Sequence, residues 1–333
     1  MADVARLAAV SKMTVSRLLA GTVPVAADKA KRIEWAIQKL GYRPNEVARA
    51  LRARKARNIG VIVPYLYDSF FAICAHEIDL IAKEHGYTVM VASSGEDPAM
   101  EEKEAGQMLR RNVEGLVLIP AASSASYLRR PEFLDLPIVT IDRPVTQTNC
   151  SAVLVQNKEG ARLGVEHLLQ HGHKRIAFFG LDRDLYTMGV RYQGYRQAMT
   201  HAGLTPEPFI ECTQEQDLVP VLGELLQGRN PTTAFFAANN LVTQWVLRAA
   251  AEIGLSVPSK VALVGFDDFE LADLLQPPLT VVRQPVRDLG RFAAQSLFEQ
   301  IKSGSNAATS KRIVLPVELV IRRSCGCRVK SAT

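Results

Sequence analysis

The N-terminal part of the chain carries the stretch AVSKMTVSRLLAG at residues 9–21. Its first serine, Ser11, is a residue type that caps helix N-termini. Val15, Leu18 and Leu19 then follow at i, i+3 and i+4, the spacing that places side chains on one face of a helix. The stretch therefore predicts a short helix that begins just after Ser11 and has one apolar face.

A second short helix is predicted immediately before this one. Val4, Leu7 and Ala8 form an apolar-periodic run that ends close to Ser11. Two small helices joined by so short a break predict a helix-turn-helix, a motif whose second helix enters the major groove of DNA. Basic side chains reach phosphates and guanine edges, small hydroxyls donate hydrogen bonds, and a methionine contacts thymine methyl groups. The expected DNA contacts are Ser11, Lys12, Met13, Thr14, Ser16 and Arg17.

The charge of the chain is concentrated at this end. Residues 1–57 hold thirteen Lys and Arg but four acidic residues, a net charge of +9, whereas the whole chain has +6. A basic head on a near-neutral body is typical of a nucleic-acid-binding domain fused to a second module. A charged face kept in solvent would explain the charge alone, but not the charge together with the helix pair.

Two further helical stretches follow. Ile33, Ile37 and Leu40 recur at helical spacing before Gly41, which predicts a third helix over about residues 26–40 and a three-helix headpiece. Residues 44–55 are also helix-capable, but they are too few to form a core of their own. We expect this stretch to order only on binding.

From residue 58 onward, apolar runs alternate with amphipathic segments. The runs predict strands at 59–63, 88–92, 115–119, 138–141, 175–180, 234–238, 261–265, 280–283 and 313–321. Helical patterns lie between them at 70–85, 101–111, 158–171, 190–202 and 241–253. This alternation predicts parallel sheets covered by helices on both faces. So many strands favour two subdomains, with a ligand cleft at the carboxyl ends of the strands.

Other features exclude several classes of protein. Five scattered cysteines argue against a disulfide framework. The N-terminus does not have the pattern of a signal peptide, and no apolar run approaches membrane-spanning length, so we expect a cytoplasmic, nucleoid-associated protein without membrane contact. No nucleophile elbow, phosphate-binding glycine loop or dinucleotide fingerprint is present, so neither an enzyme nor a cofactor is expected.

Short motifs occur in a fixed order along nearly the whole chain. They are Asp3-Val4-Ala5, Val10-Ser11-x-x-Thr14-Val15-Ser16-Arg17, Gly41-Tyr42-x-Pro44-Asn45-x-x-Ala48-Arg49-x-Leu51, Ile59-Gly60-Val61, Gly172-His173-x-Arg175-Ile176-Ala177, Arg191-x-x-Gly194-Tyr195, Gly265-Phe266-Asp267-Asp268 and Arg283-Gln284-Pro285. In these motifs the chain resembles the LacI/GalR family of transcriptional regulators. The resemblance implies a small all-α helix-turn-helix headpiece and an α/β core of the periplasmic-binding-protein type, with two subdomains of parallel sheets flanked by helices.

The resemblance also implies how the chain is divided. The DNA-binding headpiece would span residues 1–43, a hinge helix and linker 44–57, and the effector-binding and dimerisation core 58–333. Within the core, the first subdomain would comprise about 58–155 and 286–313, and the second about 156–285 and 314–327. No leucine heptad follows the last expected strand, so no tetramerising coiled coil is expected. The chain begins almost at its first helix, so a short leading segment of the family pattern is expected to be missing.

In the family, the hinge helix orders on operator DNA. Leu51 matches the leucine that each subunit pushes into the minor groove, a wedge whose unstacking cost of about a few kcal/mol is offset by contacts with the bent duplex. Asn45, Ala48 and Arg49 would lie along the groove and the backbone. Two hinge helices and two headpieces require a symmetric homodimer, and therefore near-palindromic double-stranded operator DNA.

The resemblance implies a small-molecule effector in the cleft of the core: a sugar, a sugar acid or a sugar phosphate. Phe70 and Phe71 occupy the place where sugar-binding relatives stack a ring, and one of the two is expected to be core. The other implied contacts are Arg143, Thr187, Arg191, Asn239, Asp267 and Gln284. Two arginines near the mouth favour an anionic ligand. Asp267 is expected to contact the ligand and Asp268 to make structural hydrogen bonds.

The chain departs from the family pattern at two places. Ala26 stands where the family often caps the third helix with Ser or Thr, and Asn240 replaces an Asp common after Asn239. The histidines at 167, 171 and 173 resemble a metal motif, but Gly172 should break the helix between the last two. Cys325 and Cys327 lack a nearby second pair in the sequence and are expected to be free thiols. No metal site is therefore expected.

The sequence thus favours a transcriptional regulator, a repressor that responds to a metabolite. A solute-binding transport protein would share the core fold, but it predicts a signal peptide and no basic head. An α/β enzyme with an incidental basic N-terminus predicts a catalytic constellation, and the sequence contains none that we recognise.

Overall fold

The computed structural model describes residues 1–20, 24–42, 56–304 and 310–327. The chain forms two compact units, Met1–Arg57 and Asn58–Thr333. Among the described helices, none combines the length and the apolar character needed to cross a bilayer.

The first unit contains three helices, α1 (Ala2–Leu7), α2 (Lys12–Ala20) and α3 (Ala27–Leu40). Val4, Val15 and Ile33 are fully buried where the three helices meet, and Leu18 and Leu19 pack against them. The predicted apolar face of α2 is therefore confirmed. Leu7 is an exception, because Val4, Ala5 and Ala8 form the buried face of the first segment and the Leu7 side chain stays 38% exposed.

The ends of these helices follow their local chemistry. The Ser11 hydroxyl accepts a hydrogen bond from the backbone N–H of Thr14 at 3.1 Å, so the predicted cap of α2 is confirmed. Gly41 ends α3 in the left-handed conformation at φ +58°, as expected. Ala26 stands at the start of α3 and offers no side-chain cap. The first N–H groups of α3 are thus left for a ligand or solvent.

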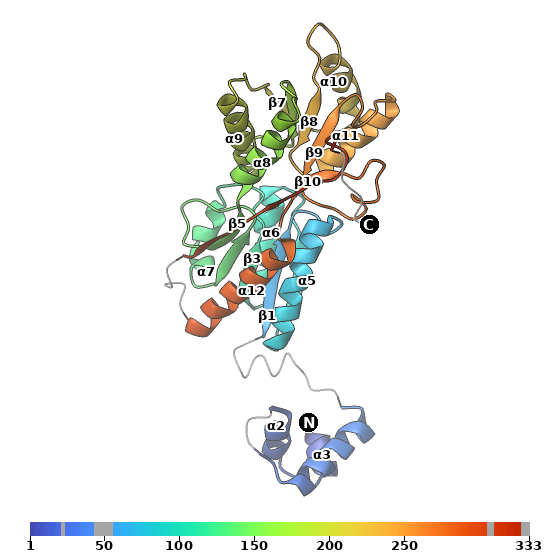
Figure 1. The fold of residues 1–333 in the computed structure, drawn as a ribbon. Helices are drawn as coiled ribbons and strands as arrows, with labels where there is room; N and C mark the ends of the chain where they lie inside the picture. Colours follow the sequence, from blue (N-terminus) through green and yellow to red (C-terminus); the bar gives the residue numbers. More distant parts are fainter. Residues whose placement is uncertain (21–23, 43–55, 305–309, 328–333) are drawn as a thin grey trace. The chain divides into compact units, whose positions relative to one another are not determined.

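The second unit is built on two separate six-stranded sheets. The first has the order β11-β5-β4-β3-β1-β2 and is parallel throughout. Its strands are β1 (Asn58–Val63), β2 (Thr88–Ser93), β3 (Val113–Leu118), β4 (Ile138–Ile141), β5 (Ser151–Val155) and β11 (Arg312–Leu315). Helices α5 (Ser69–Glu84) and α12 (Val286–Ser303) lie side by side on one face (Figure 1). The other face is covered by α6 (Pro98–Arg110), the short 3-10 helix η1 (Ser126–Arg129) and α7 (Pro131–Leu134).

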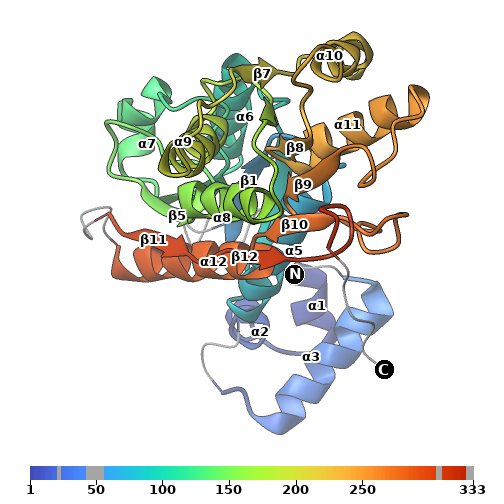
Figure 2. The same ribbon diagram turned by 45° about the horizontal axis from the view of Figure 1, so that its top comes forward.

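The second sheet has the order β12-β10-β9-β8-β6-β7, in which β12 is antiparallel to β10 and the other pairs are parallel. Its strands are β6 (Ile176–Gly180), β7 (Phe209–Glu211), β8 (Ala234–Ala237), β9 (Ala262–Phe266), β10 (Thr280–Arg283) and β12 (Glu318–Val320). Helices α8 (Asn157–Gln170) and α9 (Tyr186–His201) lie side by side on one face (Figure 2). The 3-10 helix η2 (Glu215–Asp217), α10 (Leu218–Leu225) and α11 (Asn240–Glu252) belong to the other face. The predicted architecture of parallel sheets between helices is confirmed.

The chain passes from one half of the core to the other after β5, after β10 and after β11. Residues 313–321 are therefore not one strand, as the sequence suggested. β11 pairs with β5 in the first sheet up to Leu315, and β12 pairs with β10 in the second sheet from Glu318. Pro316 separates the two strands, because proline cannot donate the ladder hydrogen bond that a continuous strand needs. The crossover thus lies a few residues after the expected boundary at 313/314.

Helices α8 and α9 approach each other unusually closely at Gly194. A Cβ atom at this position would lie 2.1 Å from the carbonyl oxygen of Lys158 and 3.0 Å from the Cβ of Ala161. Only glycine allows the two backbones to approach this closely. The contact matters for the site, because α8 begins with Asn157 and α9 carries Thr187 and Arg191.

Candidate functional site

The surface of α2 presents the side chains that the sequence assigned to DNA. Lys12, Met13 and Arg17 are exposed, and Met13 keeps 63% of its surface accessible. The hydroxyl groups of Ser11 and Thr14 form a hydrogen bond of 2.8 Å at the start of the helix. Ser16 is half-buried. The surface thus offers two cations and one apolar side chain, flanked by small hydroxyl groups. The four expected hinge contacts, Asn45, Ala48, Arg49 and Leu51, lie outside the described residues.

In the second unit, one cavity lies between the two halves of the core. It is bordered by the ends of strands from both sheets and by the first turns of α5, α9 and α11. All eight residues that the resemblance singled out border this cavity: Phe70, Phe71, Arg143, Thr187, Arg191, Asn239, Asp267 and Gln284. Residues more than 200 positions apart in the sequence are thus brought together, because parallel strands carry their carboxyl ends to the same edge.

Arg191 is the more deeply buried of the two arginines that border the cavity. Its side chain is 2% exposed, and its Nε donates to the Asn157 Oδ1 at 2.8 Å. Its Nη1 donates to the carbonyl oxygen of Ala238 at 2.6 Å and lies 3.7 Å from the Asp267 Oδ2. The guanidinium also stacks on the ring of Phe266, 3.7 Å from the centroid. Burial lowers the pKa of Arg191, and the nearby Asp267 opposes this effect.

Asp267 follows β9 in a left-handed backbone conformation at φ +76°, which is uncommon for a residue other than glycine. Burial raises the pKa of Asp267 to about 6, and Arg191 and the donating Nε2 of Gln284 limit the rise. Asp268, the next residue, turns away and forms ion pairs with Arg283 and Arg322 at 2.7 and 2.8 Å. The geometry therefore fits the expected division between a cavity carboxylate and a structural one.

Arg143 is not a free cation at the mouth of the cavity. It donates two parallel hydrogen bonds to the Glu96 carboxylate, at 2.6 and 2.7 Å, and one to the carbonyl oxygen of Pro120 at 3.0 Å. Its Nε also lies 3.4 Å from the Asp142 Oδ2. Two carboxylates thus already neutralise this guanidinium.

The charges around the cavity oppose the anionic ligand that the sequence favoured. Arg143 and Arg191 face four carboxylates, so that the formal charge of the lining is negative. These carboxylates belong to Asp68, Glu96, Asp142 and Asp267. The expectation of an anion counted the two arginines and Asp267 but missed the carboxylates of Asp68, Glu96 and Asp142. Asp142 could have been found, because it directly follows an apolar strand as Asp267 does, whereas Glu96 lies within a turn and has no such signal.

A hydrogen bond connects the two halves of the core beside the cavity. The Asn240 Nδ2 on α11 donates to both carboxylate oxygens of Asp68, at 3.1 and 3.2 Å. Asp68 also caps α5 by accepting from the Phe70 N–H at 2.9 Å. An aspartate at position 240 would instead repel Asp68. The departure noted in the sequence therefore creates an attractive contact across the cavity.

Phe70 and Phe71 begin α5 in an edge-to-face pair with ring centroids 5.2 Å apart. Both rings belong to the core of the first half, and both also border the cavity. The expectation that only one of them is a core residue is therefore wrong. Asn239 accepts from the Val242 N–H at 2.9 Å and caps α11, so its side-chain oxygen is already engaged.

Comparisons with known protein families find one match within each of the two units. Residues 1–45 match the family of bacterial regulatory proteins named lacI, and residues 165–325 match a periplasmic binding protein-like domain.

Full-length relatives extend these matches. The ribose operon repressor of Halalkalibacterium halodurans is 31% identical, over 97% of this chain and 96% of its own. The transcriptional repressor PurR of Aliivibrio salmonicida is 30% identical, over 90% and 91%. The crystal structure of the lac repressor dimer bound to operator and the anti-inducer ONPF superposes with a TM-score of 0.85, at 27% identity, over 97% of this chain and 98% of that one. The chain therefore belongs to the LacI family of bacterial regulatory proteins, and it is a transcriptional regulator rather than an enzyme.

Proposed function

We propose that this regulator binds a near-palindromic operator as a homodimer, and that a small neutral sugar in the core cavity changes its affinity for the operator. The side chains of α2 would face the DNA, and Asn45, Ala48, Arg49 and Leu51, which lie outside the described residues, would extend the contact into the minor groove. Operator binding would place the protein on the nucleoid. The lac repressor structure, which is a dimer bound to operator, supports this arrangement.

The observation that carries the effector proposal is the set of buried polar atoms without a hydrogen-bond partner. Among the described residues there are six such side-chain atoms. Three of them belong to residues that border the cavity: the Asp142 Oδ1, the Gln284 Oε1 and the Arg143 Nε, which is ion-paired with Asp142 at 3.4 Å but makes no hydrogen bond. A fourth is the Nδ2 of Asn157, whose Oδ1 accepts from Arg191. Leaving such atoms unpaired costs about 1–3 kcal/mol each. A polyhydroxylated ligand can donate to the oxygens and accept from the nitrogens.

The negative charge of the cavity lining and the aromatic rings of Phe70 and Phe71 favour one class of ligand. A negatively charged lining disfavours sugar acids and sugar phosphates, and the rings of Phe70 and Phe71 suit the apolar face of a pyranose or furanose. One relative is a ribose operon repressor, which agrees with a sugar. A thermal-shift screen should show that neutral sugars raise the unfolding temperature, since a ligand at 100 times its Kd stabilises by about 2.7 kcal/mol. Stabilisation by sugar phosphates alone would contradict this choice.

Effector affinity should depend on pH through Asp267. A ligand hydroxyl can donate a hydrogen bond to the ionised Asp267 carboxylate. Because the pKa of Asp267 is about 6, lowering the pH below 6 protonates this carboxyl in the ligand-free protein. We expect the association constant to be constant above pH 7 and to fall by about tenfold per unit below pH 6. Titration calorimetry from pH 5 to 8 measures this. Asp267→Asn should bind weakly with a flat profile; an unchanged slope in that variant would assign the titration to another group.

Asn240→Asp should weaken effector binding. The substitution replaces a donor 3.1 Å from Asp68 with a second carboxylate, so two like charges would meet across the cavity. The arrangement that encloses the ligand then becomes less favourable, and we expect a loss of about tenfold or more in affinity. Because repulsion is the cause, Asn240→Asp with Asp68→Asn should recover binding. Failure of the double variant to recover would show that the contact has no such role.

Leu51→Ala should weaken operator binding and leave effector binding intact. If Leu51 supplies the wedge that kinks the duplex, its loss removes part of the contacts that offset the unstacking of about a few kcal/mol. Fluorescence anisotropy with a labelled operator and with a scrambled duplex separates specific from non-specific affinity. Equal specific affinity in the variant and the parent chain would remove Leu51 from the interface.

A further inference from the structure

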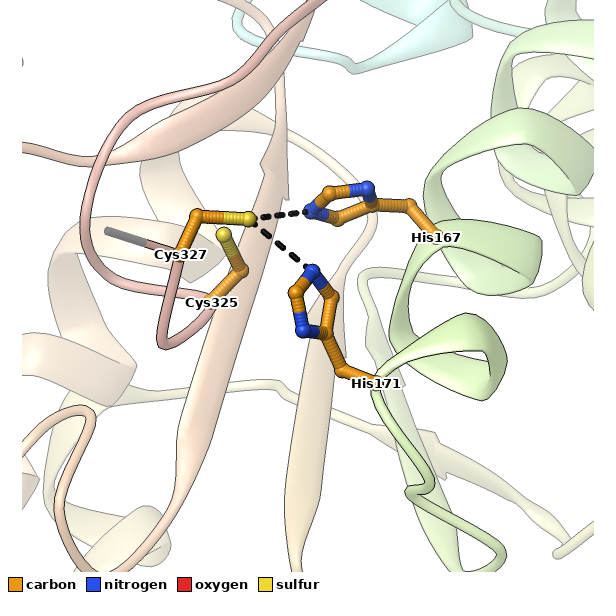
Figure 3. A group of neighbouring side chains, drawn as sticks. All are labelled: His167, His171, Cys325 and Cys327. Atoms are coloured by element: carbon orange, nitrogen blue, oxygen red, sulfur yellow. Dashed lines mark hydrogen bonds between the residues drawn. The ribbon is translucent and has the colours of Figure 1, made fainter. Parts of the chain in front are cut away.

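Four potential metal ligands, two buried and two at least partly exposed, meet in the second half of the core, and none of them borders the cavity. They are His167 in the last turn of α8, His171 at the C-terminal cap of α8, and Cys325 and Cys327 near the end of the chain. Their ligand atoms all lie within 4.8 Å of one another. Figure 3 shows the two imidazole rings facing the two thiols across the gap between the helix and the C-terminal loop. The sequence separates the pairs by more than 150 residues, which is why each looked incomplete by itself.

The distances within the cluster are already close to those of a bound site. The Cys327 Sγ lies 2.9 Å from the His171 Nε2 and 3.5 Å from the His167 Nε2. With bonds of about 2.3 Å to sulfur and 2.0–2.1 Å to nitrogen, a tetrahedral zinc ion holds its ligand atoms about 3.3–3.8 Å apart. Small rotations of the side chains are therefore enough to bring the four atoms to ligand distance.

Both halves of the cluster are held in place by the fold. His167 lies in the last turn of α8 and His171, four residues later, is its C-cap, so their rings lie on the same side with centroids 4.7 Å apart. On the other side, Ser324 fixes the loop, because its hydroxyl donates to the Leu263 carbonyl at 2.6 Å and accepts from the Thr280 N–H at 2.8 Å. Gly326 then turns the chain at φ +88°, so that the cysteines on either side both contribute to the cluster.

We propose that His167, His171, Cys325 and Cys327 bind one Zn²⁺ ion as a structural site that fastens the C-terminal loop to α8. Two thiolates and two imidazoles are a ligand set that zinc takes in closed tetrahedral sites, and the two thiolates neutralise its charge. The thiol protons pass to solvent on binding. His173, the third histidine of the sequence motif, does not belong to the cluster; its Nδ1 instead lies 3.1 Å from the Thr233 Oγ1.

The site has a consequence for the core but does not depend on the proposed effector. Helix α8 begins at Asn157, which holds Arg191, and it packs closely on α9. A metal clamp at the far end of α8 would restrain the same helix at both ends. Zinc should therefore raise the unfolding temperature of the core whether or not a sugar is bound.

The test uses the full chain, reduced and stripped of metal with a chelator. Zn²⁺ is titrated in competition with a chromophoric chelator, and Co²⁺ is bound as a spectroscopic probe. We expect one equivalent of metal per chain, thiolate-to-cobalt charge-transfer bands with the visible bands of tetrahedral Co²⁺, and a higher unfolding temperature with Zn²⁺.

Matched variants assign the ligands. His171 is exposed and Cys327 is half-buried, so His171→Gln and Cys327→Ser should fold normally, as circular dichroism would verify. Each should lose more than about 100-fold in Zn²⁺ affinity, since even an outer-shell change costs 10–100-fold. The controls His76→Gln and Cys150→Ser change the same residue types outside the cluster and should bind like the parent chain. Zinc affinity that is equal in the parent chain and in a chain carrying both His171→Gln and Cys327→Ser, or no stoichiometric binding by the reduced chain, would overturn the proposal.

Discussion

Replacing Arg191 with alanine is expected to abolish effector binding. The guanidinium is buried between Asn157, Ala238 and Asp267, and it supplies the positive charge on this side of the cavity. Without it, Asp267 is a buried carboxylate with no cation beside it, and removing one member of a buried pair typically costs about 3–5 kcal/mol. The affinity loss therefore has two sources, a missing donor for the ligand and a cavity whose remaining charge is unpaired.

Two further variants keep this prediction testable if Arg191→Ala folds poorly. Arg191→Lys retains the charge but cannot donate to the Asn157 Oδ1 and the Ala238 carbonyl in the fixed fork of a guanidinium, so it should also bind weakly. Arg196→Ala removes an exposed arginine from the same helix and should bind like the parent chain. Titration calorimetry with the sugar found in the screen measures all three. An effector isotherm unchanged in Arg191→Lys would exclude Arg191 from the site.

Gly194→Ala should lower the stability of the core strongly, although it adds only one methyl group. Its Cβ would stand 2.1 Å from the Lys158 carbonyl oxygen, which is backbone and cannot rotate away, so α8 and α9 must move apart. Overpacking of this kind costs about 1–3 kcal/mol and occasionally more, and 1 kcal/mol shifts the Tm of a domain of 150–250 residues by about 2–4 °C. We expect a decrease in Tm of about 6 °C or more.

The same separation would move Arg191 away from Asn157, so effector affinity should fall as well. Gly223→Ala is the matched control, because a Cβ at that position in α10 meets nothing within 4 Å. It should leave Tm unchanged or raise it slightly, since alanine is favoured over glycine in a helix by about 0.5–1 kcal/mol. Calorimetric unfolding of the two variants gives the comparison. Equal Tm values would mean that α8 and α9 tolerate the larger side chain.

The elements of the fold that could be predicted are those with strong local patterns. Long apolar runs such as Ile138–Ile141 and capped helices such as α2 are determined by their own residues. The split between β11 and β12 could not be seen, because it depends on two sheets that the chain joins by a crossover. A proline inside the predicted strand was the one local signal.

Part of the cavity lining could be predicted from the sequence, because several of its residues directly follow predicted strands. Asp267 and Gln284 each follow an apolar strand, and parallel strands bring such residues to one edge. Asp68 and Asn240 are 172 residues apart, and their hydrogen bond arises from how the two halves of the core face each other. The cluster of His167, His171, Cys325 and Cys327 was missed for the same reason, since pairs that look incomplete in sequence become adjacent only in three dimensions.

We propose above all that a ligand bound in the core changes the affinity of the headpiece for operator DNA. The most direct test of this proposal selects genomic fragments with the full chain and then measures affinity for the recovered site by anisotropy, with and without the sugar from the screen. We expect a near-palindromic site whose affinity changes by about 5–150-fold with the sugar, and a fragment of residues 58–333 that binds the sugar but not the DNA. Operator affinity that stays the same at saturating sugar would contradict the account.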